Sequence, residues 1–126
     1  MKYFWAPAAV LTLLLAASLW NAARIERDVA PWCETLTEAS DAAARGEWDA
    51  AARLVRETRA AWEARREWLH IVVTHDELEA ADTLFASAET YAAERDETEF
   101  RAEAAKLIVQ LRVVAETQQL SLRNVL

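Results

Sequence analysis

Hydrophobic residues follow two different patterns along the chain. Residues 3–20 form a run of eighteen residues without a charge, close to the length that an α-helix needs to cross the hydrocarbon of a bilayer. Beyond this run, apolar residues recur at three- and four-residue steps among charged ones, as they do along one face of a helix. The pattern predicts a transmembrane helix within residues 1–23 and a helical domain over residues 24–126.

The polar region divides into helices at residues that favour helix ends. The first apolar stripe starts at Ile25 and stops before Gly46, the only glycine and a residue suited to the left-handed conformation after a helix. Pro31 lies inside this stripe and predicts a kink, or a break with the helix restarting there. Two caps are expected: a capping box from Thr74 to Glu77, and a second cap at residues 96–99.

The helices that follow each carry a stripe of expected core positions. Residues 71–73 are β-branched, but the run is too short and solitary to pair as a strand. With one glycine and two prolines, the chain also lacks the turn residues that many strands would need. The predicted fold is all-α: a transmembrane helix that continues into an antiparallel bundle of about four helices. The expected inward positions are Trp48, Ala51, Val55, Thr58, Trp62 and Leu69; then Leu78, Ala81, Leu84 or Phe85, Ala88 and Tyr91; then Phe100, Ala104, Leu107, Leu111 and Val114.

Charge narrows the class of partner. Lys2 is the only charged residue among the first twenty, so the remainder carries 13 basic and 21 acidic groups, a net charge of −8. Such a surface repels nucleic acid. Arginine and glutamate alternate along the helical faces, which is typical of solvated helices. We therefore expect no nucleic-acid partner.

The apolar run has two interpretations, an anchor or a cleaved signal peptide. Ala16, Ala17 and Ser18 offer small residues for cleavage. The run is nevertheless longer than a usual signal core, and Trp5 and Trp20 bracket it as interfacial aromatics do. The favoured prediction is a single-pass signal-anchor in the cell membrane, held through residues 3–20, with the C-terminal domain outside the cytoplasm; a cleaved and secreted form is the alternative.

Histidines supply the candidate metal ligands. Glu67 and His70 have the Glu-x-x-His spacing of bundle di-iron sites, but no second such pair exists. His70 and His75, with Asp76 or Glu79, are candidates for a zinc site around a helix junction. Two histidines around an interhelix turn are more often solvated or capping residues. We expect no metal and no cofactor.

Tryptophans and one cysteine are the other conspicuous side chains. Trp48, Trp62 and Trp68 suit either a ligand pocket or the core, and their spacing favours the core. Cys33 has no partner for an internal disulfide, and burial beside Trp32 is favoured over a cross-linked dimer. No serine, histidine and acid fall in a catalytic frame, and one glycine cannot form a phosphate-binding loop. The sequence does not predict an enzyme.

Two resemblances add to this reading. Residues 44–51 are similar to the turn of a tetratricopeptide-type hairpin, but no second copy follows at the repeat period. Over nearly the whole chain, the short anchor, Trp62 and Trp68, the segment His75-Asp76-Glu77-Leu78 and the ending from Leu120 to Leu126 resemble a bacterial family named domain of unknown function 4363. His75, Glu77, Leu122 and Asn124 carry this resemblance. It implies a small anchored helical protein without assigned activity, acting beside other envelope proteins.

The end of the chain has two possible roles. The fourth helix is expected to end near Leu120, after which Leu122, Val125 and Leu126 fold back to plug one bundle end, with Asn124 satisfying helix carbonyls. Alternatively, this tail is a docking motif for a partner. The leading functional prediction is a membrane-anchored, non-enzymatic interaction or accessory domain of the cell envelope, possible also as a homodimer. A sensory or ligand- and metal-binding bundle and a single-hairpin adaptor are the alternatives.

Overall fold

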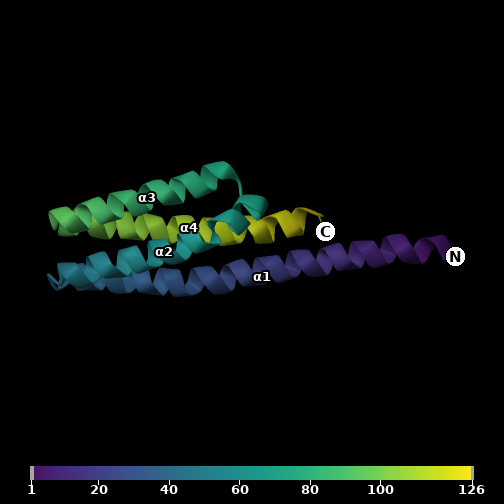
Figure 1. Ribbon diagram of the computed structural model, residues 1–126, viewed down its shortest axis with the longest axis horizontal. Coiled ribbons are helices and arrows are strands. Elements are labelled where there is room, and N and C mark those ends of the chain that lie inside the picture. The colour runs from purple at the N-terminus through teal and green to yellow at the C-terminus, as the bar shows by residue number, and fades with distance from the viewer. Residues whose placement is uncertain (1, 126) are drawn as a thin grey trace.

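The chain folds into an antiparallel bundle, shown in Figure 1 from a computed structural model that describes the backbone of residues 2–125 and the side chains of residues 5–20, 23–71 and 73–117. Within the described backbone there are four helices and no strands: α1 (Lys2–Ala44), α2 (Trp48–Val72), α3 (His75–Glu94) and α4 (Glu97–Val125). Successive helices reverse direction. α1 packs against α2 and α4, and α3 packs against the same two helices, so the predicted all-α bundle is confirmed.

The predicted stripes form the core. Almost all expected inward residues are buried, including Phe100, Leu107 and Leu111 of α4. On α3, the sequence predicts either Leu84 or Phe85 as an inward residue. Phe85 is buried, whereas Leu84 and Tyr91 are only partly buried. Trp48 is also partly buried. The three- and four-residue periodicity therefore identifies the core faces of all four helices.

α1 is continuous, so of the kink or break predicted at Pro31 the break is wrong. The helix runs through both Pro7 and Pro31. Proline removes one N–H and leaves the carbonyl four residues earlier, that of Arg27, without a partner. Arg27 and Pro31 are both exposed, so water can reach that carbonyl. The Thr35 hydroxyl donates to the Pro31 carbonyl at 3.0 Å. The bundle face and the apolar run consequently belong to one rod of 43 residues.

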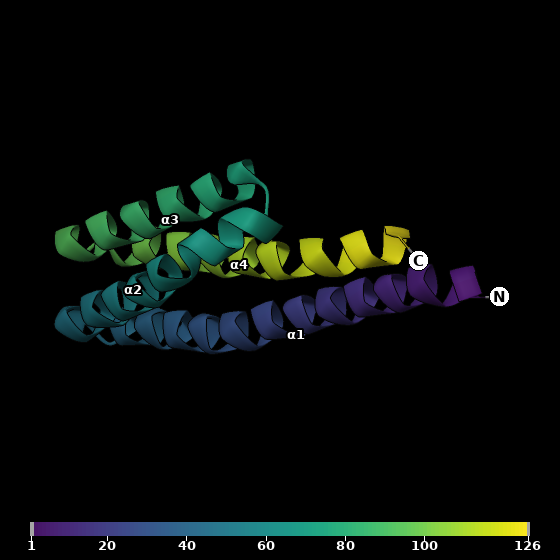
Figure 2. The same cartoon turned by 45° about the vertical axis from the view of Figure 1, so that its right-hand side comes forward.

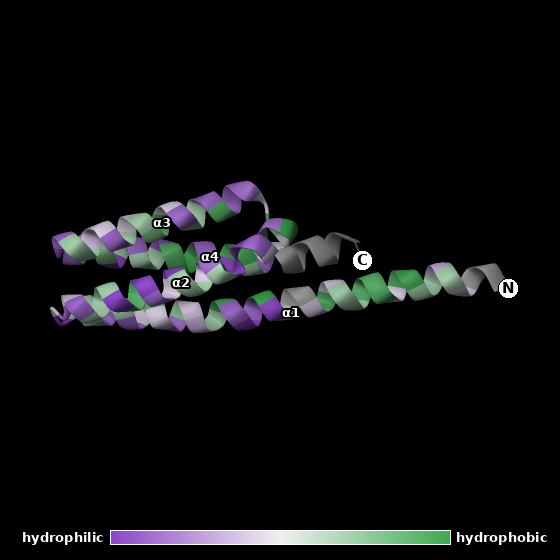
Figure 3. Cartoon of the chain, in the orientation of Figure 1, coloured by the Kyte–Doolittle hydropathy of each residue, from purple (hydrophilic) through white to green (hydrophobic). Residues whose placement is uncertain are grey.

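The N-terminal part of α1 extends beyond the other helices. In Figure 3 the hydrophobic colour runs along most of this extension, whereas the helices of the bundle alternate between hydrophobic and hydrophilic colours. The apolar stretch is long and hydrophobic enough to cross a membrane, and none of its most apolar window of 18 residues is buried within the protein. Trp5 and Trp20, the two bracketing tryptophans, are both exposed.

Two of the interhelix turns use the left-handed conformation. Gly46 has φ +76°, and the amide of Glu47 donates to the Ala42 carbonyl at 2.9 Å, which closes α1 with a Schellman motif. Arg95 closes α3 in the same way with φ 55°, and the amide of Asp96 donates to the Tyr91 carbonyl. Both motifs satisfy carbonyls that a helix end leaves open.

Of the two predicted caps, one forms. The Asp96 carboxylate accepts from the Glu99 amide at 3.1 Å, as expected at the start of α4. The capping box at Thr74 is wrong, because the Thr74 side chain makes no cap hydrogen bond. Glu77 instead faces α4, where the Gln110 side-chain amide donates to its carboxylate at 2.6 Å and to its carbonyl at 3.1 Å. A hydrogen bond between α3 and α4 thus replaces the predicted capping box.

The predicted plug at the C-terminus is also wrong. α4 does not end near Leu120 but remains helical to Val125. Residues 115–125 contain no glycine or proline, so nothing in the sequence stops the helix. The side chains of Leu122 and Asn124 lie outside the described side chains, and Leu126 lies outside the described residues.

Candidate functional site

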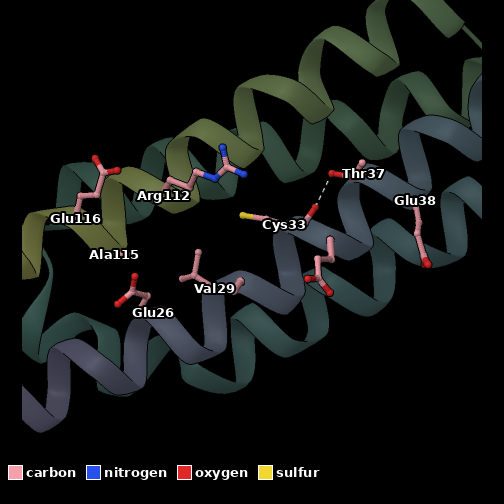
Figure 4. A pocket seen from close by; sticks show the side chains of 10 residues that line it. Glu26, Val29, Cys33, Thr37, Glu38, Arg112, Ala115 and Glu116 are labelled. Atoms are coloured by element: carbon pink, nitrogen blue, oxygen red, sulfur yellow. Dashed lines mark hydrogen bonds between the residues drawn. The ribbon is translucent and has the colours of Figure 1, made fainter.

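A groove with a volume of about 580 Å³ lies between α1 and α4. Figure 4 shows α1 and α4 as its two walls. Val29, Cys33 and Ala115 form the floor of the groove, and the exposed Ala30 adds to its apolar lining. The three floor residues are buried at the contact between the two helices. Because alanine and cysteine are small, the two helices leave this space open beside their contact.

The edges of the groove are mostly acidic. On α1, Glu26, Glu34 and Glu38 line it, and α4 contributes Glu116 and the single cation Arg112. Figure 4 shows Arg112 lying across from Cys33. Four carboxylates and one guanidinium around an apolar floor favour a ligand that is cationic at its edges and apolar at its centre.

Cys33 is buried, as the sequence predicts, with 6% of its surface exposed. Burial raises the pKa of the Cys33 thiol, and the guanidinium of Arg112 offsets only part of this effect. The thiol therefore remains protonated at neutral pH, and a protonated thiol is a poor nucleophile. Cys33 contributes a small apolar surface to the groove.

Trp62 lies at the centre of the bundle, where the sequence places it. Its side chain is 0% exposed, and its ring packs edge-on against Trp32 at 6.0 Å and beside Phe85 at 6.1 Å. The indole N–H donates to a carboxylate oxygen of Asp82 at 2.8 Å. The other Asp82 oxygen pairs with Arg66 at 2.7 Å, so a chain of polar contacts leads from the core to the surface.

The other two tryptophans lie nearer the surface. Trp68 is partly buried, with the guanidinium of Arg24 over its ring at 5.6 Å. Trp48 packs edge-on against Phe100 and lines a smaller pocket of about 310 Å³. The tryptophans therefore contribute mainly to packing and do not converge on one cavity.

The histidines meet at the turn between α2 and α3. The imidazole rings of His70 and His75 stack with their centroids 5.8 Å apart. His75 Nε2 lies 3.0 Å from a carboxylate oxygen of Glu79. Glu67 is exposed on α2. Among the residues that the structure describes, no three histidine, cysteine, aspartate or glutamate side chains gather as metal ligands would.

Sequence reasoning missed both the groove and Asp82. Glu26, Ala30, Cys33 and Thr37 are spaced at four- and three-residue steps, and this row of small or acidic residues beside the buried stripe is a signal that could have indicated the groove. The partner of Trp62 could not be inferred, because it depends on the register between α2 and α3.

The fold and groove together define a class: an antiparallel four-helix bundle in which the first helix continues beyond the bundle as an apolar rod. The chain belongs to the family described as domain of unknown function DUF4363, whose sequence model matches residues 19–125. This match confirms the family resemblance. None of the curated proteins and none of the solved structures compared with the chain matches it.

Proposed function

We propose that the protein is a membrane-anchored, non-enzymatic interaction domain of the cell envelope, and that it binds a basic segment of another envelope protein in the groove between α1 and α4. The observation that carries this proposal is the groove itself, with four carboxylates around a floor of Val29, Cys33 and Ala115. A helix or loop with one apolar side chain flanked by lysine or arginine would complement it.

The position of the groove along α1 supports this proposal. Its α1 wall starts at Glu26, six residues after Trp20, which is about 9 Å along a helix. With residues 3–20 in the membrane, a bound segment would lie close above the bilayer. Such a site suits the membrane-adjacent part of another membrane protein.

The core of the bundle is closed. Within the described side chains, every buried nitrogen and oxygen has a hydrogen-bond partner, and Trp62 is fully packed. A partner would therefore bind the surface of this domain.

Site-specific photocross-linking in native membranes tests the proposal. A photoreactive residue replaces Thr37, which lines the groove, and in a parallel variant it replaces Thr90, which is exposed on α3. We expect a discrete cross-linked partner from position 37 only. Glu34→Lys with Glu38→Lys should reduce its yield at least about tenfold, because like charges at an interface cost several kcal/mol.

The matched control changes net charge equally at a distance from the groove. Glu67 and Glu94 are exposed on α2 and α3, so Glu67→Lys with Glu94→Lys should leave the cross-link unchanged. Cross-links that are equal at positions 37 and 90, or equally sensitive to both pairs of substitutions, would refute a specific groove. Protease added to intact spheroplasts tests the topology, since only an exported bundle would be digested.

A ligand-binding bundle is the second candidate. The groove volume of about 580 Å³ falls in the range of small-molecule sites. An amphiphilic cation would use the same acidic edges. Two measurements separate the two functions. Binding of a small cationic amphiphile with micromolar affinity, together with the absence of any protein cross-link from position 37, would favour the ligand-binding function.

A further inference from the structure

The relative position of α1 and α4 has a consequence at the end of the bundle that faces the apolar run. Two contacts fix their antiparallel register: the Cys33 thiol lies against the Ile108 carbonyl, and the Arg101 guanidinium donates to the Ser40 hydroxyl. Both pairs give the same register, because Ile108 is seven residues after Arg101 and Cys33 is seven residues before Ser40. Each residue further along α4 is therefore level with one residue earlier in α1.

Extended along both helices, this register places the last turn of α4 beside the apolar run. Ser121 is level with Trp20, and Val125, the last residue of α4, is level with Ala16. Figures 1 and 2 both show α4 continuing past α2 and α3 alongside α1. The end of α4 therefore overlaps the apolar run by five residues, 121–125, whose first and last Cα atoms are about 6 Å apart along the helix axis.

The composition of α4 changes where this overlap begins. The bundle is strongly acidic, but after Glu116 the chain contains no further acidic residue. Leu120, Leu122 and Val125 follow, with Arg123 as the only charge. An apolar segment with one arginine is suited to the boundary between acyl chains and lipid phosphates, because arginine can extend its guanidinium to the headgroups.

We propose that the C-terminal turn of α4 is a second membrane contact, a segment (residues 120–125) that lies where the lipid headgroups meet the acyl chains, beside the transmembrane part of α1. This inference rests on the proposed anchoring through residues 3–20. The overlap of about 6 Å is small compared with the roughly 30 Å of hydrocarbon, so the segment reaches only the boundary where headgroups meet acyl chains. The end of α4 limits how deep the segment can lie in the membrane. Its last four carbonyls have no hydrogen-bond partner within the helix, and burying them in hydrocarbon would be unfavourable.

The second contact fixes the orientation of the bundle. A single helix leaves a domain free to rotate about the helix axis and to tilt with it. A segment of α4 at this boundary on one side of α1 restricts both motions, so the α1–α4 groove keeps a constant direction relative to the membrane plane.

Depth-dependent fluorescence quenching of the full chain in vesicles tests this proposal. The vesicles contain phosphatidylcholine and phosphatidylglycerol, with a nitroxide either on the headgroup or deep on the acyl chain. In a Cys33→Ala background, an environment-sensitive fluorophore is attached to one cysteine: Asn124→Cys for the α4 end, Leu13→Cys for the transmembrane part, or Thr98→Cys for the distant end of α4. Circular dichroism verifies that each variant keeps its helix content.

We expect the label at position 124 to be quenched several-fold more than the label at position 98, and more by the headgroup nitroxide than by the deep one. The label at position 13 should show the reverse depth preference. Quenching at position 124 as weak as at position 98, with position 13 quenched, would overturn the second contact alone. An unquenched label at position 13 would instead overturn the proposed anchor.

Protein contact is the competing outcome. A label at position 124 that is blue-shifted but shielded from both nitroxides would lie against protein, such as a second copy of the chain, and would refute the lipid contact. As a second arm, Leu122→Glu with Val125→Glu should abolish headgroup quenching at position 124 while leaving the label at position 13 quenched.

Discussion

Removal of the Asp82 carboxylate tests the polar chain in the centre of the bundle. In Asp82→Ala the indole N–H of Trp62 loses its acceptor, now at 2.8 Å, while the ring stays in a site where it is 0% exposed. A buried donor without a partner costs about 1–3 kcal/mol. The ion pair of Asp82 with Arg66 adds less than about 1 kcal/mol, because both side chains are partly exposed.

The expected loss for Asp82→Ala is therefore about 2–3 kcal/mol of the free energy of unfolding. For a domain of about 100 residues, each kcal/mol lowers the midpoint of thermal unfolding by roughly 4–8 °C. The measurement is circular dichroism at 222 nm on the full chain in mild detergent, with tryptophan fluorescence as a second probe of the core. We expect both probes to show a decrease in Tm of roughly 10 °C or more.

A double-mutant cycle separates the hydrogen bond from other effects of the substitution. Asp82→Asn retains an oxygen acceptor and should lose less than half as much stability. In a Trp62→Phe background there is no indole N–H to satisfy, so Asp82→Ala should cost about 1–2 kcal/mol less than in the native background. Equal losses in both backgrounds would show that the contact between Trp62 and Asp82 does not stabilise the bundle.

Three further predictions concern the helix ends and the buried thiol. Gly46→Ala should lower stability by about 1 kcal/mol through backbone strain alone, since φ is +76° and no atom lies within 4 Å of the added Cβ; an unchanged denaturation midpoint would contradict this. Arg95→Gly should raise stability by a similar amount, roughly 0.5–1 kcal/mol, because Arg95 has φ 55°; a loss would mean that its side chain contributes more than the strain costs. The raised pKa of Cys33 means that the unfolded thiol ionises first, so stability should fall as pH rises above about 8.5. That fall, measured by denaturation at pH 8 and pH 10, should be smaller in Cys33→Ala.

The elements and core of this fold follow from local information. Ile25, Val55, Leu78 and Leu111 are all fully or almost fully buried, and periodicity alone predicts each of them as inward. The end of α1 at Gly46 and the cap at Asp96 also depend only on neighbouring residues. Local chemistry therefore accounts for where the helices lie and which faces they bury.

Apart from the C-terminal plug, the errors occur where one helix meets another. Glu77 has a suitable position for a capping box, but Gln110 of α4 bonds to it instead. Pro31 remains within α1 because it is exposed, and exposure depends on which side of the helix the bundle covers. Asp82 and the α1–α4 groove depend on register between helices. Periodicity in one helix contains no information on register with another.

Continuity of α1 also bears on how the bundle folds. A first helical turn in water is disfavoured by a factor of roughly 10³, or about 4 kcal/mol, because several residues are ordered for one hydrogen bond. In a bilayer the apolar part of α1 has to be helical, since its backbone groups have no other partners. With that part inserted, residues 24–44 only lengthen an existing helix. In the anchored chain that we propose, the membrane supplies the nucleus on which the bundle assembles, and the same bundle without residues 3–20 should fold more slowly even where its stability is unchanged.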